Sequence, residues 1–240
     1  MDKRPKNEEY LIPVSLCVHT ITNNLYRDLQ VWLTLKFFFG FKFMLDRETL
    51  KKVSDWVSVS TRTVRRSINS LLEINWIGHD QNTGIYYIRG FYRIMEIEGL
   101  KGKTAARFQI TWTEEIRAFL AGVVIGYLVN HRKKSEREAS RKKRRGLPAS
   151  RSGSFQPVSI STLSQVLEVS ESTAFRLRKE AADKDFISMK QNIINTQVPI
   201  KYIKIYKEVQ TNHVFAKDGM VFEQFPNLCR PELKFKARRH

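Results

Sequence analysis

An internal repeat constrains the fold of this chain most, because two copies of one sequence pattern imply two copies of one local structure. Residues 50–77 align with residues 160–187 without a gap, at a constant offset of 110. The identical pairs are Ser54/Ser164, Val59/Val169, Ser60/Ser170, Thr63/Thr173, Arg66/Arg176 and Ile77/Ile187. Six identities are few, but several of them surround one break in the apolar pattern. We therefore expect two related structural units.

The apolar spacing in each copy predicts two short amphipathic helices that meet at a tight turn. The inward positions of the first helix are Leu50, Val53, Trp56 and Val57 in one copy, and Ile160, Leu163, Val166 and Leu167 in the other. A break follows at residues 58–60 and 168–170, where the valine can fill the corner and the serine can cap a new helix. The inward positions of that second helix are Val64, Ile68, Leu71 and Leu72, and Ala174, Leu177 and Ala181. This arrangement is a helix-turn-helix.

Strand patterns follow both copies. After the first, residues 76–80 and 85–89 read as two strands joined by a polar turn at residues 81–84. The second copy continues through residues 186–192 toward the alternating segment Val198–Tyr206, which we expect to be β-rich. An apolar helix is also predicted upstream of each copy, at Leu29–Phe39 and from Glu114 to about Arg132.

In both copies the turn and the start of the second helix read V-S-x-x-T-h-x-R, and this pattern resembles the winged-helix family. The resemblance implies an α+β, mostly helical chain with two winged-helix domains related by the repeat and joined by a basic linker. We expect the first domain at residues 1–112, with an N-terminal strand extension. The second is expected at residues 113–240, with a basic, flexible insertion at residues 130–157 and a basic C-terminal tail.

The charge of the chain indicates the chemistry of its partner. Its 240 residues include 42 Lys and Arg against 24 Asp and Glu, a formal charge of +18. With 42% apolar residues the chain can build cores, which excludes a wholly disordered basic tail protein. Eleven of the basic residues, against four acids, lie at residues 113–157, around the expected linker. A folded cation of this kind favours a polyanion, and nucleic acid comes before membrane.

In a helix-turn-helix the second helix enters the major groove of DNA. Arg can bond guanine and Asn can bond adenine in a bidentate manner, so the polar face of this helix has the chemistry for base reading. The candidates in the first copy are Ser60, Thr61, Arg62, Thr63, Arg65, Arg66 and Asn69. A solvated basic face is the alternative. Hairpin residues that could touch the DNA backbone or minor groove, as wings do in winged-helix proteins, are His79, Gln81, Asn82 and Arg89.

The second copy is less basic, because Phe175 replaces the equivalent of Arg65 and Glu171 begins its helix. Phe175 could contact a protein or a thymine methyl group. The DNA-binding candidates here and in the linker are Ser172, Arg176 and Lys179, and Arg141, Lys142, Lys143, Arg144 and Arg145. At the shared position Arg66/Arg176, a phosphate contact and a salt bridge to a neighbouring helix both stay open. The basic run could follow phosphates, act as a nuclear import signal or keep the linker soluble.

The sequence contains no complete signature of an enzyme active site or of a membrane-spanning helix. Residues 99–104 resemble the end of a phosphate-binding loop, but Ile97 stands where that loop needs glycine, and a strand rather than a helix is predicted to follow. The histidines form no metal-spaced pair, and two cysteines, Cys17 and Cys229, make no disulfide framework. The apolar stretch Ala118–Val129 is too short to span a bilayer and predicts a buried helix. We expect no enzymatic activity, cofactor, metal or membrane partner.

These observations predict a double-stranded-DNA-binding protein that reads sequence mainly through the first copy. Two winged helices in one chain are similar to plasmid and phage replication initiators, which use such a pair on repeated origin sites. A transcriptional regulator would share these features. The expected location is the cytoplasm, on the nucleoid, or the nucleus in a eukaryotic source. Candidate protein partners are a second copy of the chain and a component of the replication or transcription machinery.

Two alternatives belong to other classes. One is an architectural or adaptor protein that binds DNA without sequence preference and recruits a protein through its second domain. The other is a nuclease or recombinase, which would need carboxylates gathered from remote segments.

Overall fold

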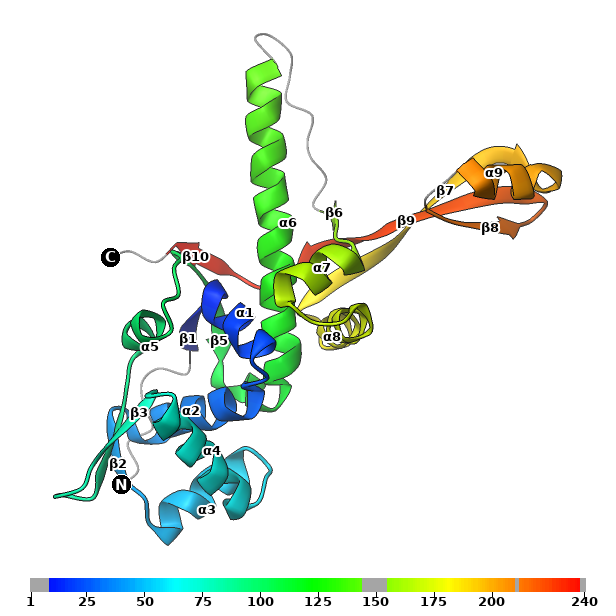
Figure 1. Ribbon diagram of the computed structural model, residues 1–240. Coiled ribbons are helices and arrows are strands. Elements are labelled where there is room, and N and C mark those ends of the chain that lie inside the picture. Colours follow the sequence, from blue (N-terminus) through cyan, green and yellow to red (C-terminus); the bar gives the residue numbers. More distant parts are fainter. Residues whose placement is uncertain (1–8, 144–154, 210–211, 238–240) are drawn as a thin grey trace. The chain divides into compact units, whose positions relative to one another are not determined.

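A computed structural model describes residues 9–143, 155–209 and 212–237. It is α+β, as expected, and it divides into two compact units. Unit 1 is Met1–Val124 together with Leu233–His240, and unit 2 is Ile125–Glu232. The division falls inside helix α6 (Ile116–Lys143), which carries the chain from one unit into the other, whereas the sequence placed the boundary after residue 112 (Figure 1).

The first sheet of unit 1 joins segments from distant parts of the sequence. Strand β5 (Thr104–Gln109) pairs antiparallel with β1 (Glu9–Pro13) on one side and with β10 (Phe235–Ala237) on the other. In Figure 1 the red β10 returns to the green β5. Strand β1 lies in the expected N-terminal extension and leads directly into α1 (Val14–Thr22), while α5 (Phe91–Ile97) precedes β5. The sequence analysis predicted neither of these helices.

The remainder of unit 1 contains the first copy of the repeat. Its helices are α2 (Tyr26–Phe39), α3 (Arg47–Trp56) and α4 (Thr61–Glu73). Helix α4 packs against α2 and α3 through Val64, Ile68 and Leu71, which are fully buried. Strands β2 (Lys42–Met44), β3 (Ile77–Asp80) and β4 (Ile85–Ile88) form an antiparallel sheet in the order β2-β4-β3. The predicted pair of helices and the predicted hairpin are confirmed.

One prediction about the first helix of each copy is wrong. Trp56 and its repeat partner Val166 were expected to point inward, but both side chains are 36% exposed. Trp56 is the last residue of α3, and its ring packs at the edge of the unit against Phe37 and Phe38, with ring centroids 5.6 and 5.2 Å away. The predicted helical spacing of these positions is therefore correct, but the core does not extend far enough to cover Trp56 and Val166.

Unit 2 contains the second copy in α7 (Ile160–Leu167) and α8 (Glu171–Asp183). Its sheet has the order β6-β9-β7, formed by β6 (Gln156–Pro157), β9 (Met220–Pro231) and β7 (Ile187–Pro199), and β8 (His213–Lys217) pairs with the far half of β9. The fully buried side chains of α7 and α8 are Leu163, Leu167, Ala174, Leu177 and Ala181.

The expected β-rich segment Val198–Tyr206 is largely helical. After β7 ends at Pro199, the chain forms the 3-10 helix η2 (Ile200–Tyr202) and α9 (Ile203–Val209). Ile203 and Tyr206, three residues apart, are the partly covered side chains of α9, and the Tyr206 hydroxyl donates to Glu223 at 3.3 Å. Apolar residues at this spacing share a face of a helix and not of a strand.

Part of the segment predicted to be a flexible insertion has regular structure, because α6 continues to Lys143 and residues 130–143 are helical (Figure 1). Ion pairs four residues apart stabilise this extension: Arg132 with Glu136 at 3.4 Å and Lys134 with Glu138 at 3.9 Å. Residues 144–154 lie outside the described part of the chain.

The apolar stretch Ala118–Val129 belongs to α6 and is mostly buried, as predicted for a core helix. Phe119, Val123 and Ile125 are fully covered. No helix in the described ranges is both long and apolar enough to cross a membrane.

The backbone of the second helix-turn-helix leads to a prediction about stability. Glu168 has a φ of +52° in the turn between α7 and α8, and this conformation costs an L-residue roughly 1–2 kcal/mol. We expect Glu168→Gly to raise the free energy of unfolding by about 0.5–1 kcal/mol, measured by chemical denaturation. The control Lys179→Gly replaces an exposed residue in the interior of α8 and should lower the same quantity by about 1 kcal/mol. If both variants lost the same free energy of unfolding, the backbone of Glu168 would not be strained as we infer.

Candidate nucleic-acid interface

Hydrogen bonds fix the corner between α3 and α4. The hydroxyl of Ser54 donates to the carbonyl of Val59, and the backbone N–H of Val59 donates to the carbonyl of Ser54 at 3.1 Å. The hydroxyl of Ser60 then accepts the N–H of Thr63 at 3.2 Å and caps α4. This corner sets the direction in which α4 leaves α3.

Packing decides which face of α4 meets solvent. The buried positions Val64, Ile68 and Leu71 recur at spacings of four and three residues and form one stripe. The opposite face carries Thr61, Arg62, Arg65, Arg66 and Asn69, all exposed. The structure therefore brings these five predicted residues onto one surface.

The charged groups on this surface are free to bind a ligand. Arg62, Arg65, Arg66 and Asn69 border a shallow depression together with Ser70 and Glu73. The side chains of those first four residues form no hydrogen bond or ion pair with any residue that the structure describes. Each guanidinium thus keeps its five N–H donors for an external acceptor.

Ser60 and Thr63 have a different role from their neighbours. Their hydroxyl oxygens lie 2.9 Å apart, and both groups take part in the cap of α4. They were predicted to touch DNA, but in this structure their hydrogen bonds hold the start of the helix. Their observed contribution is to position the Arg and Asn side chains that follow.

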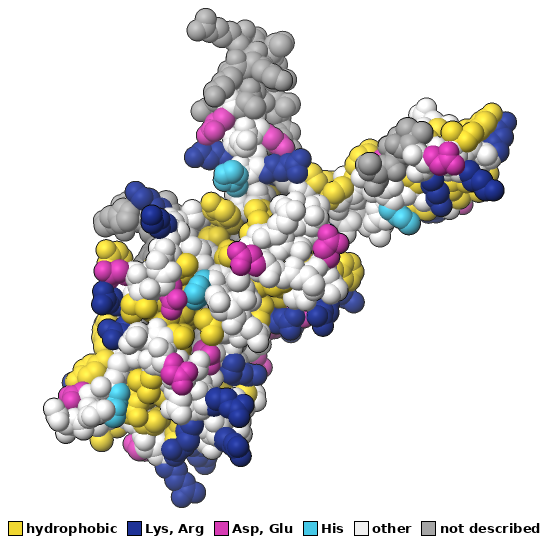
Figure 2. All heavy atoms as spheres, in the orientation of Figure 1, with side chains coloured by type: hydrophobic (Ala, Val, Ile, Leu, Met, Phe, Trp, Pro, Cys, Tyr) yellow, Lys and Arg dark blue, Asp and Glu magenta, His cyan; other side chains and the backbone are white. Residues whose placement is uncertain are grey.

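Further basic residues surround the exposed face. Arg47 and Lys51 of α3 are exposed, and the ammonium group of Lys52 lies 4.6 Å from the ring centre of Phe38. Figure 2 shows Lys and Arg side chains gathered over α3 and α4 at the lower end of unit 1. A surface of this composition attracts phosphate.

The tip of the β3–β4 hairpin is ordered by Asp80. Its carboxylate accepts the Thr83 hydroxyl at 2.8 Å and the Asn82 N–H at 2.9 Å, and these bonds lower the pKa of Asp80. Gly84 has a φ of +69°, which suits glycine at the end of the turn. Gln81 and Asn82 are exposed at the tip.

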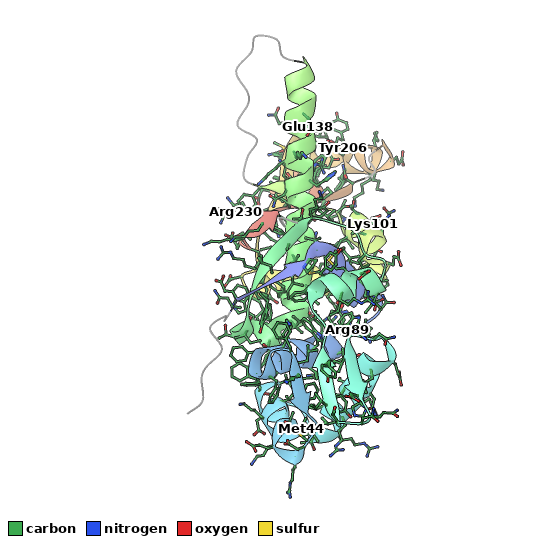
Figure 3. The ribbon with its side chains drawn as sticks, turned by 90° about the vertical axis from the view of Figure 1, so that its left-hand side faces the viewer. Met44, Arg89, Lys101, Glu138, Tyr206 and Arg230 are labelled. Carbon is green, nitrogen blue, oxygen red and sulfur yellow. The ribbon has the colours of Figure 1, made fainter. Side chains whose placement is uncertain are left out.

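His79 and Arg89 lie away from this tip. The His79 ring stacks on Tyr86 with centroids 4.3 Å apart, and Tyr86 stacks on Phe43 at 5.2 Å, so one aromatic row crosses the three strands. Arg89 follows β4 at the base of the hairpin (Figure 3), and its Nε is buried without a hydrogen-bond partner in the described structure. The structure therefore groups Gln81 with Asn82 but separates Arg89 from them.

Unit 2 repeats the corner geometry. The Ser164 hydroxyl donates to the Val169 carbonyl at 2.6 Å, and the Ser170 hydroxyl accepts the Thr173 N–H at 3.3 Å. Every residue from 61 to 70 shares its class of burial with the residue 110 positions later. The exposed face of α8 accordingly carries Ser172, Phe175, Arg176 and Lys179.

The chemistry of this second face differs from that of α4. The side chain of Phe175 is 50% exposed, and the Arg176 guanidinium donates to the Thr173 hydroxyl at 3.3 Å. In the described structure neither Arg66 nor Arg176 forms the salt bridge that the sequence left open. The side chain of Arg176 thus already forms a hydrogen bond within its own helix, whereas the side chain of Arg66 forms none in the described structure.

Sequence reasoning missed Arg178. This residue is only 6% exposed, its guanidinium donates to the Val158 carbonyl at 3.2 Å, and burial lowers its pKa. It ties α8 to the segment before α7. The signal was present in the repeat, since Arg178 occupies the position of the core residue Ile68.

The basic run of the linker is mostly undescribed. Arg141, Lys142 and Lys143 end helix α6, but only their backbone is placed. Arg144 and Arg145 lie outside the described residues.

Neither a metal site in the described residues nor a match to a known protein indicates a function. In the described ranges no three His, Cys, Asp or Glu side chains are grouped so as to hold a metal ion. No family model matches the chain, and comparisons with curated proteins and with solved structures gave no significant match. The chemistry of the surfaces above is therefore the basis for assigning a function.

The cap at Ser60 leads to a second stability prediction. We expect Ser60→Ala to lower the free energy of unfolding by about 1 kcal/mol, because the N–H of Thr63 loses its acceptor. The neighbouring exposed Thr61→Ala is the control and should change stability by less than about 0.5 kcal/mol. Thermal unfolding followed by circular dichroism measures both. A loss as large at Thr61 as at Ser60 would contradict the assigned cap.

The Asp80 turn should depend on pH. Because the pKa of Asp80 is depressed in the folded state, its stabilising contribution is complete above the unfolded-state pKa. This contribution is lost as the pH falls through the folded-state pKa, below the ordinary value for aspartate. We expect the amide NMR signal of Asn82 to move over this acid range in the wild type and, at neutral pH, to be displaced in Asp80→Ala. An Asn82 signal that ignores both changes would refute the role of Asp80.

Proposed function

We propose that this protein binds double-stranded DNA with sequence specificity and places α4 in the major groove. The observation that carries the proposal is the exposed face of α4, where Arg62, Arg65, Arg66 and Asn69 lie together without partners in the described structure. Arg can bond guanine O6 and N7, and Asn can bond adenine N6 and N7. A helix held at its start by a tight corner presents such groups as a fixed pattern.

We further propose that both units are winged-helix domains related by duplication. The order of elements supports this, since each unit contains a helix, a short strand, two helices and a hairpin, with sheet orders β2-β4-β3 and β6-β9-β7. Residues with positive φ also recur at the offset of 110: Ser58 with Glu168, at +53° and +52°, and Asn75 with Asp185, at +58° and +57°. Unrelated segments would rarely share two such positions.

Phosphate contacts would supply most of the affinity. The basic residues of α3 flank α4, and Gln81 and Asn82 at the hairpin tip could bond the DNA backbone. With a formal charge of +18, the affinity should fall steeply as salt rises. Base contacts from α4 would then select the site.

A role in replication initiation on a plasmid or phage fits two reading units in one chain. The arrangement resembles that of initiators, which use paired winged helices on repeated origin sites. Transcriptional regulation is the alternative within the same class. Direct repeats of the recognised sequence in the source genome would favour an initiator, and a single site before a gene would favour a regulator.

One observation favours a second candidate function for unit 2. The side chain of Phe175 is half exposed, and Glu171 begins the same helix, so α8 suits a protein surface better than phosphate. In that case unit 2 would recruit a protein partner while unit 1 binds DNA. Phe175→Ala would then leave DNA affinity intact and abolish the protein contact, whereas a loss confined to DNA binding would exclude this role.

Selection of bound duplexes from a random DNA pool, followed by binding measurements, tests the main proposal. We expect Arg62→Ala or Arg65→Ala to lower discrimination between the selected site and a mutated site by about 1–3 kcal/mol, because a bidentate contact to a base is lost. Lys101→Ala is the matched control, since this exposed residue of unit 1 lies on the turn before β5 (Figure 3). Unchanged discrimination in both Arg variants would exclude α4 as the reading helix.

A further inference from the structure

The far end of the β7–β9 hairpin carries a small folded head, which we define as η2, α9, β8 and the distal halves of β7 and β9. Val214 and Val221 are buried between its helix and strands. The buried carboxylate of Glu223 accepts hydrogen bonds from the Tyr206 hydroxyl at 3.3 Å and from the Asn212 amide at 2.6 Å. The head therefore has its own core and its own polar anchor, which hold α9 in one orientation.

The sequence of η2 and α9 has a period of three. Ile203 and Tyr206 occupy the inward stripe, and the next stripe is a row of lysines, Lys201, Lys204 and Lys207, all exposed. The third stripe places Tyr202, 46% exposed, and Ile205, 64% exposed, beside that row. Figure 2 shows the resulting mixture of Lys and hydrophobic side chains at the end of this hairpin.

The lysines of this row are available to a partner. In the part of the chain that the structure describes, none of the three forms an ion pair, and the ammonium of Lys201 lies 5.0 Å from the ring centre of its neighbour Tyr202. The acid of the head that faces inward, Glu223, is already occupied by its two donors. Exposed apolar side chains beside unpaired cations indicate an anionic partner that also has an apolar surface to pack against.

We propose that the head is a second DNA contact, in which the lysine row follows one strand's phosphates and Tyr202 and Ile205 pack into the groove beside it. This inference depends on the proposed function. From Lys201 to Lys207 the row covers six rises of 3-10 and α-helix and is roughly 9–12 Å long. Its ammonium groups lie at the ends of flexible side chains, so each can reach a phosphate of the same strand. Apolar side chains next to Lys are typical of proteins that insert between base steps.

The length of the hairpin would separate this contact from any DNA contact that α8 makes. Strand β7 has 13 residues, which at about 3.3 Å each extend roughly 40 Å, somewhat more than one turn of DNA at about 34 Å. The head would therefore bind phosphates outside any stretch that α8 covers. It would add affinity without reading the bases of the central site.

The test compares Lys201→Ala/Lys204→Ala and Ile205→Ala with the wild type on the selected duplex, extended by flanking DNA on both sides. We expect the double variant to reduce the slope of log affinity against log salt by about two, because two phosphate contacts are lost. A flanking patch of hydroxyl-radical protection should disappear while the central patch remains. Ile205→Ala should weaken binding several-fold with unchanged discrimination. Lys101→Ala removes one charge elsewhere and should preserve the flanking patch.

The outcomes separate this inference from the proposed function. If the wild type recovers a motif but the head variants keep its salt slope and footprint, the head makes no DNA contact and the proposal for α4 still stands. If the wild type binds no duplex, both proposals fail. Unchanged DNA binding with reduced self-association in sedimentation would instead assign the head to a second copy of the chain. Circular dichroism confirms that these surface variants fold.

Discussion

The packing of α4 against α2 and α3 is the interaction on which the rest of unit 1 depends. Three side chains that lose all contact with water fix the rotation of α4 about its axis, and the exposed face follows from that rotation. The capped corner at Ser60 fixes where the helix begins. Arg62, Arg65 and Asn69 are thereby held outward by residues that never touch a ligand. The backbone beneath such a surface is already fixed, so a ligand would have to order only the exposed side chains.

The two units use the same local frame for different chemistry. At the corner and along the following helix, burial and capping agree residue by residue, but α4 presents free guanidinium groups and α8 presents an aromatic ring with a partly committed arginine. Arg178 shows the same divergence inside the core, where a buried cation bonded to a carbonyl replaces the apolar Ile68. Duplication would explain the shared frame, and the differences give the two exposed faces different chemistry.

The sequence predicted the helix-turn-helix pairs well because several local signals agree there. The apolar period, the serine caps and the valine at each corner all indicate the same two helices. The exposed residues of α4 could also be predicted, because they lie on the face of the helix opposite its buried residues. The β3–β4 hairpin was predicted for a similar reason, since a polar turn ending in Gly84 separates two segments that begin with isoleucine and read as strands.

Where the prediction failed, local pattern and tertiary environment disagreed. The segment from Ile200 onward repeats every three residues, between the period of a strand and that of a helix, and only packing on β8 decides for a helix. Trp56 has the correct spacing but lies beyond the core. The cap at Ser60 was predicted and is observed, but residue type does not decide whether the same hydroxyl also meets a ligand, because one hydroxyl suits both roles. The pairing of β10 with β5 joins positions too far apart for any local pattern to reveal.

That pairing has a consequence for how the molecule is made. Unit 2 is inserted between two segments of unit 1, so the strand that completes the first sheet is synthesised only after all of unit 2. Until then one edge of β5 has no partner, and an open edge strand is a site for mispairing. Contacts that join such distant positions also form slowly. On the ribosome the first sheet of unit 1 would therefore remain incomplete until unit 2 has been synthesised, and a nascent chain halted between them would expose an unfinished sheet.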